Sequence, residues 1–251
     1  MHLLAVVVVP THHSLRCGLQ AEHSAEGTAR CHRWRNAVKR AKSDGIKAYF
    51  FVDLLVFPTP VLAAWQNATT GDGKTVAWND ATRQLLKVLV QETFARFPGC
   101  DGWIVRTGET YTYDTPYHVG NTPNPGKTAE VWVDFIKFLR DEVCAGQGKD
   151  LFFRGWDNWP STADYYQQMT DQIEPHSQLY FSIKHSAGDF TRPAQWNPQL
   201  GVGKHAQIVE VELQREYEGK ASCEVLEYRT HDPCIFVHSY AKLGHTSEIA
   251  L

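Results

Sequence analysis

Hydrophobic residues along the chain form short continuous runs that alternate with segments of helical period. The runs are rich in Val, Ile, Leu and Phe, which is typical of strands covered on both faces of a sheet. Predicted strands span 3–9, 47–57, 102–107, 151–155, 179–184, 207–213 and 234–240. Between them, apolar residues recur three and four positions apart, as in amphipathic helices. Predicted helices span 30–42, 80–97, 128–139 and 161–173.

Polar residues ahead of three of these segments indicate where the helices begin. Asn79 or Asp80 can cap the second helix, and Thr128 can open the third. Ser161 and Asp164 have the spacing of a capping box ahead of the fourth. These signals support separate helices between the strands.

The alternation of strands and helices predicts an α/β fold with a parallel sheet. A closed (β/α)8 barrel of TIM type and an open doubly wound sheet both satisfy this order. No G-x-G-x-x-G follows the first strand, and the glycines near 71–75 lack P-loop spacing, so a nucleotide-binding fold is disfavoured. Neither a repeat nor a linker divides the chain, so we expect one domain over residues 1–251.

Charged residues stand at the ends of four successive predicted strands. These residues are Arg106, Arg154, Lys184 and Glu210. Burying an isolated charge is costly, so this repetition predicts one polar cluster where the strands end. In parallel barrels the active site lies at the carboxyl ends of the strands. Side chains alternate along a strand, so Glu210 and Glu212 share the side opposite Val209 and Val211.

The predicted cluster combines three cations with three carboxylates. Its members are Arg106, Arg154, Lys184, Glu109, Asp189 and Glu210. Arginine binds carboxylates through two hydrogen bonds, so the cations fit a substrate that carries a negative group. Crowded carboxylates suit acid and base chemistry, because crowding raises one pKa and leaves the other group ionised. Trp156 and other nearby aromatic residues suit a sugar ring. A buried salt-bridge network without a catalytic task is the alternative.

The composition of the chain disfavours several classes of binding partner and several kinds of site. With 25 basic and 28 acidic residues in 251, the chain has no cationic excess for nucleic acid or an anionic membrane. Its longest apolar run, 3–9, is too short to span a bilayer. The six cysteines form no C-x-x-C pair, so we expect buried or idle thiols. The twelve histidines lack ligand spacing, so we expect no metal and no cofactor, with a metal-dependent lyase or hydrolase as the rival hypothesis.

Five segments in a fixed order carry a family resemblance. Residues 183–190 read I-K-H-S-A-G-D-F, and 208–219 read I-V-E-V-E-L-Q-R-E-Y-E-G. Upstream, 101–109 read D-G-W-I-V-R-T-G-E, 153–156 read F-R-G-W and 45–49 read G-I-K-A-Y. These segments resemble those of the α-glucuronidases of glycoside hydrolase family 67. In the same order, the patterns of that family are V-K-N-G-P-x-D-F, E-L-Q-x-x-Q-E-Y-x-G, D-G-F-x-V-K-A-N-S-E-G, W-R-x-F and G-I-K-V-Y.

The resemblance covers about residues 45–219 and implies a TIM-barrel hydrolase that removes glucuronic acid from plant polysaccharides such as xylan, with inversion. It places Glu109 as the general acid, and Asp189 and Glu210 at the positions that activate water. Residues implied to bind the substrate are Arg106, Arg154 and Lys184, at its carboxylate, with Trp156 and Glu212 beside them. The expected partner is therefore a uronic-acid-bearing carbohydrate.

The sequence also departs from the family. Arg106 stands where the family has Lys, one residue fewer precedes Glu109, and Glu212 replaces a Gln. The family's N-terminal β-domain, early barrel strands and helical C-terminal domain are not recognisable, so we expect an incomplete barrel. An inactive, sugar-binding barrel fragment is the alternative function. The oligomeric state and the compartment, cytoplasmic or secreted, stay open.

Overall fold

The computed structural model describes residues 25–69, 76–106, 118–119, 129–155, 160, 162–187, 196–211 and 239–243. Helical elements are α2 (Ala25–Ser43), α3 (Thr59–Ala64), the 3₁₀ turn η2 (Gln66–Ala68), α4 (Asp80–Arg96), α6 (Ala129–Leu139), the π-helical segment η3 (Arg140–Ala145) and α7 (Ala163–Thr170). Strands are β1 (Tyr49–Asp53), β2 (Phe57–Pro58), β3 (Gly102–Arg106), β4 (His118–Val119), β5 (Asp150–Arg154), β6 (Leu179–Lys184), β7 (Ala206–Val211) and β8 (Ser239–Leu243).

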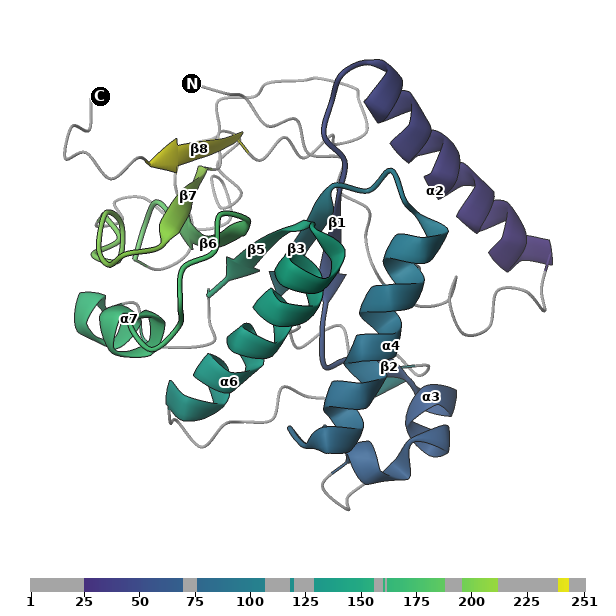
Figure 1. Cartoon of the computed structure of the whole chain (residues 1–251), viewed down its shortest axis with the longest axis horizontal. Coiled ribbons are helices and arrows are strands. Elements are labelled where there is room, and N and C mark those ends of the chain that lie inside the picture. The colour runs from purple at the N-terminus through teal and green to yellow at the C-terminus, as the bar shows by residue number, and fades with distance from the viewer. Residues whose placement is uncertain are drawn as a thin grey trace, which may run out of the picture.

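The main sheet has the order β1-β3-β5-β6-β7-β8 (Figure 1). The first five strands are parallel, and described helices lie in sequence between β1 and β3, between β3 and β5 and between β5 and β6, so the predicted α/β fold is confirmed. β8 instead runs antiparallel to β7, which differs from the parallel strand expected over 234–240. In the described part of the chain, β1 and β8 form the two edges and the barrel is not closed. The strand predicted at 3–9 lies outside the described residues.

The strand predicted over 47–57 is two separate elements. β1 ends at Asp53, and β2 pairs antiparallel with β4 in a second, two-stranded sheet. Leu54 still donates its N–H to the carbonyl of Arg106 at 2.8 Å, but Leu55 has a φ of +66°. This left-handed conformation, unusual for leucine, turns the chain away from the main sheet. The run stays apolar because Leu54 and Leu55 are both buried in the core, not because the strand continues.

α4, α6 and α7 begin within two residues of the predicted positions, and α2 begins five residues before the predicted residue 30. Asn79 caps α4 by accepting a hydrogen bond from the N–H of Thr82 at 3.1 Å. α7 is capped by Thr162, whose hydroxyl accepts from the N–H of Tyr165 at 3.3 Å, and not by Ser161 as expected. Thr162 is the N-cap because it directly precedes the first helical residue and itself has an extended conformation, which is typical of N-cap residues.

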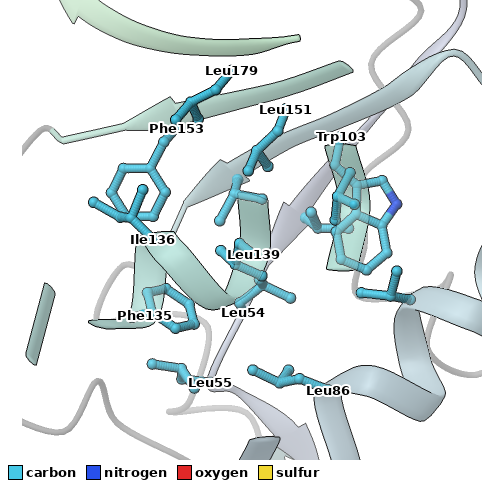
Figure 2. Packing of buried hydrophobic residues seen from close by; sticks show 14 of the residues in the cluster. Leu54, Leu55, Leu86, Trp103, Phe135, Ile136, Leu139, Leu151, Phe153 and Leu179 are labelled. Carbon is cyan, nitrogen blue, oxygen red and sulfur yellow. The ribbon is translucent and has the colours of Figure 1, made fainter. Parts of the chain in front are cut away.

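The outer face of the main sheet packs against α2, α4, α6 and α7 in one large hydrophobic cluster. Figure 2 shows Phe153 of β5 beside Ile136 of α6, whereas Trp103 of β3 stacks on Phe94 of α4. The opposite face, called the inner face below, carries a smaller cluster. That cluster consists of Tyr49, Ile104, Phe152 and Ile208, with Phe51 and Tyr180 against it. Burial on both faces explains why the strands read as continuous apolar runs.

The described cysteines are not all in the same oxidation state. Cys100 and Cys144 are free and buried as expected, and burial raises their pKa values to about 11 and about 12. Cys31 is disulfide-bonded, so the expectation of an idle thiol is wrong there. Its partner lies outside the described residues. Among the helices that the structure describes, none is both long and apolar enough to cross a membrane.

Candidate functional site

Four of the eight predicted site residues lie in the described part of the chain. They are Arg106, Arg154, Lys184 and Glu210. Glu109, Trp156, Asp189 and Glu212 lie outside the described residues, and their roles stay predictions.

The four described residues stand together at the carboxyl end of the parallel strands. Arg106 ends β3, Arg154 ends β5 and Lys184 ends β6, while Glu210 precedes the last residue of β7. Alternation along each strand places all four on the inner face, above Ile104, Phe152 and Ile208. In the register, Lys184 is directly opposite Glu210. The strand-end pattern in the sequence thus corresponds to one cluster in space.

Arg154 and Glu210 form a buried ion pair. The Nε of Arg154 donates to one carboxylate oxygen of Glu210 at 2.5 Å, and its Nη2 donates to the other at 2.7 Å. Only 9% and 1% of the two side chains is exposed. The hydroxyl of Ser182 adds a third hydrogen bond to Glu210, at 2.7 Å. Because β5 and β7 flank β6, this pair bridges over β6, and Ser182 supports it from below.

Arg106 forms a second ion pair, with Asp53 at the end of β1. Its Nε lies 2.5 Å from Oδ1 and its Nη2 lies 2.9 Å from Oδ2 of Asp53. Asp53 is 4% exposed and Arg106 14% exposed as side chains. Sequence reasoning missed Asp53, because it lies inside an apolar run that was expected to continue to residue 57. The signal that could have found it is the same strand-end rule, applied after the run 49–52.

The ring of Phe51 connects the two ion pairs. The guanidinium carbon of Arg106 lies 5.0 Å from the ring centroid of Phe51, and that of Arg154 lies 5.1 Å from it. Both distances are within the range of cation–π attraction. The two guanidinium groups are therefore no farther apart than these two distances combined.

The cluster is well suited to hold an anionic group. Among the described residues it contains three cations and two carboxylates, with Lys184 only 6% exposed. A guanidinium has five N–H donors, and each internal carboxylate uses the edge formed by Nε and Nη2. The internal pairs thus fix the orientation of both guanidinium groups.

Glu210 is held in a way that suits an orienting role. Both of its oxygens accept hydrogen bonds from Arg154, and Ser182 adds another. An adjacent guanidinium favours the ionised form of a carboxylate, which makes proton abstraction from water less favourable. The predicted part of Glu210 in activating water stays a prediction. Within the described ranges, no three His, Cys, Asp or Glu residues are grouped as metal ligands.

Comparison with known proteins gives weak structural similarity only. The sequence matches no protein-family model, and no curated protein matches it. A family 20 β-N-acetylhexosaminidase from Streptomyces coelicolor A3(2) is 14% identical with a TM-score of 0.39 over 62% of this chain. A chitobiase from Flavobacterium johnsoniae is 15% identical with a TM-score of 0.37 over 73% of this chain. The chain spans 28% and 31% of the lengths of those two proteins.

Both of these structures are glycoside hydrolases, and neither is an α-glucuronidase. The likeness to family 67 therefore rests on the sequence motifs alone.

Proposed function

We propose that this chain is a glycoside hydrolase domain that acts on a sugar carrying a carboxylate, glucuronic acid being the best match. The observation that carries the proposal is the cluster of Arg106, Arg154 and Lys184 on one face, where the parallel strands end. Arg154 and Lys184 are buried and the side chain of Arg106 is 14% exposed, and all three lie on the face opposite the helices. The family 67 motifs point to the same residues.

In this proposal the cations and the carboxylates have different roles. Arg106, Arg154 and Lys184 bind the substrate carboxylate, with Trp156 and Glu212 beside the sugar. Glu109 protonates the leaving oxygen. Asp189 takes the proton of the attacking water, and Glu210 holds Arg154 in place. Inversion requires that the acid and the base lie roughly 6.5–9.5 Å apart, which leaves room for the water. No cofactor takes part.

The experiment compares two substrates in two proteins. Substrates are an aldouronic oligosaccharide and its neutral analogue without the carboxylate, and the readout is release of the terminal sugar. Arg154→Ala is a poor probe, because it would leave the buried Glu210 without its cation. Arg154→Lys keeps the charge and removes the two-pronged contact. Arg83→Lys, at a half-exposed arginine of α4, is the matched control.

We expect Arg154→Lys to lower kcat/KM for the glucuronate substrate about tenfold or more, since a charge-assisted contact is worth roughly 1.5–3 kcal/mol. The neutral analogue should lose little, and Arg83→Lys should change neither value. Equal losses on both substrates would show that Arg154 is structural. Absence of sugar release by the unmodified protein would refute catalysis.

The second candidate is a sugar-binding domain without catalytic activity. The observation that favours it is that both described carboxylates, Asp53 and Glu210, are already engaged with arginines. This candidate predicts that the oligosaccharide binds and shifts the melting temperature but is recovered intact.

A further inference from the structure

We propose that Trp196 is a binding platform for a neutral sugar ring, next to the place where the acidic sugar binds. Among the residues that the structure describes, it is the one large hydrophobic side chain that is exposed, at 52%. The inference rests on the proposed function, because it takes the ligand to be carbohydrate. It adds that the substrate is an oligosaccharide or a polysaccharide, and that the sugar chain attached to the acid is bound as well as the acid itself.

Exposure distinguishes Trp196 from the other described tryptophans. Burial of a tryptophan stabilises a fold, because it removes a large apolar area from water. The other described tryptophans all pack against the main hydrophobic cluster, and they are Trp34, Trp65, Trp78, Trp103 and Trp132. A single exposed apolar residue is common on protein surfaces, so a role for Trp196 requires a fixed position near the candidate site.

The backbone beneath Trp196 is fixed by hydrogen bonds of buried polar residues. Trp196 itself forms an antiparallel bridge with Ser186. The next residue, Asn197, donates its N–H to the carbonyl oxygen of His185 at 2.9 Å and its Nδ2 to that of Ser186 at 3.3 Å. Asn197 is 4% exposed and Ser186 1% exposed. An aromatic side chain on a backbone that is already ordered loses little conformational freedom when a ligand binds.

This fixed segment lies at the carboxyl end of the main sheet, beside the charged cluster. Ser186 follows Lys184 by two residues, and the N–H of His185 donates to the carbonyl oxygen of Glu210 at 3.0 Å. Directly bridged residues have Cα atoms about 5 Å apart, and two residues of extended chain add at most about 7 Å. The Cα of Trp196 is therefore within about 12 Å of the Cα of Lys184, a span comparable with that of a disaccharide.

The surroundings of Trp196 favour a sugar over a protein partner. The C–H groups on one face of a sugar ring pack on an aromatic ring, and the hydroxyl groups need polar neighbours. The residues in backbone contact with this segment, His185 and Ser186, are polar, and so is Asn197. A protein interface instead needs a contiguous apolar patch, and in the described ranges no other large hydrophobic residue is exposed. A neutral aromatic ring therefore fits the uncharged part of the sugar chain.

The test compares ligands that differ in length and in charge. The probes are glucuronic acid, a glucuronosyl xylo-oligosaccharide and the same xylo-oligosaccharide without the acid. Calorimetry measures their affinities, with KM in place of affinity for a probe that is cleaved. Trp196→Ala removes the platform, and Trp196→Tyr keeps an aromatic ring. The control is Glu174→Ala, at an exposed residue of the connection that enters β6.

We expect the unmodified protein to bind the glucuronosyl oligosaccharide more tightly than glucuronic acid alone. Trp196→Ala should weaken binding of both oligosaccharides about tenfold, which is the size of effect that loss of stacking on an aromatic side chain has. It should leave binding of glucuronic acid unchanged. Trp196→Tyr should stay within about threefold of the unmodified protein, because a ring remains. Glu174→Ala should change no affinity, and the melting temperature should stay the same throughout, because both positions are exposed.

The outcomes separate this inference from the proposed function. If the unmodified protein binds none of the three probes, the proposed function is wrong, and the platform is overturned with it. If the glucuronosyl oligosaccharide binds no more tightly than glucuronic acid, or if Trp196→Ala retains the difference, only the platform is overturned. If the two oligosaccharides bind equally well and Trp196→Ala weakens both, the platform is supported and the acidic specificity is wrong.

Two further results would also overturn the platform. Equal weakening for all three probes in Trp196→Ala would show a general structural role. A change of oligomeric state in sedimentation, with all affinities retained, would show that Trp196 belongs to a protein interface.

Discussion

The buried pair of Arg154 and Glu210 provides a quantitative test of how the inner face is stabilised. We expect either partner to be costly to remove alone and the pair to be much less costly to remove together. Removal of one member of a buried, hydrogen-bonded pair costs about 3–5 kcal/mol, because the other charge stays in a poorly solvated site. Here that site is well defined, since the two side chains are 9% and 1% exposed. The total stability of a domain is only about 5–15 kcal/mol.

The perturbations are Arg154→Met, Glu210→Leu and the double variant. Replacement of a whole buried ion pair by apolar side chains of similar volume is often neutral or stabilising. The double variant still loses stability at Ser182. Its hydroxyl donates to Glu210 at 2.7 Å and loses this acceptor when Glu210 is replaced. An unsatisfied buried donor costs about 1–3 kcal/mol. We therefore expect each single variant to lose about 3–5 kcal/mol and the double variant about 1–3 kcal/mol.

Urea unfolding followed by circular dichroism measures these differences, and the cycle gives the coupling energy. A loss of 3–5 kcal/mol corresponds to a melting temperature lower by about 6–20 °C for a domain of this size. Asp44→Asn is the control, because it breaks an exposed pair with Arg40 and should cost less than about 0.5 kcal/mol. If the losses of the two single variants simply add in the double variant, the pair is not coupled and the reasoning fails.

Two further predictions concern stability at other positions. In Gly102→Ala the new Cβ would lie 2.0 Å from the backbone oxygen of Asp150, so we expect a loss of about 3 kcal/mol in urea unfolding, and an unchanged midpoint would contradict this packing. Burial lowers the pKa of His205, whose Nε2 lies 2.9 Å from the carbonyl oxygen of Thr170. The unfolded chain therefore binds a proton at a higher pH than the folded protein, and stability should be complete above about pH 6.5 and decrease as the pH falls below it. His205→Gln should reduce this dependence, and equal slopes between pH 7 and pH 5 in both proteins would refute the assignment.

The sequence by itself determined most helices and, to within one residue, the carboxyl ends of β3, β5 and β6. The cap at Asn79 and the apolar stripe of α6 depend on residues within one or two helical turns of each other, so propensity and periodicity predict them. The charges of Arg106, Arg154 and Lys184 were predicted to gather because parallel strands end at one edge of a sheet. That prediction needs only the strand order, which the alternation of elements supplies.

The tertiary structure decided which charges are partners. Arg154 pairs with Glu210 across 56 positions of sequence, and Arg106 pairs with Asp53 across 53 positions. Strand order and register set these contacts, and no local pattern encodes them, since many pairings of three cations with several carboxylates fit the same sequence. The antiparallel direction of β8 and the turn at Leu55 are likewise non-local, because the environment of neighbouring strands overrides the apolar pattern.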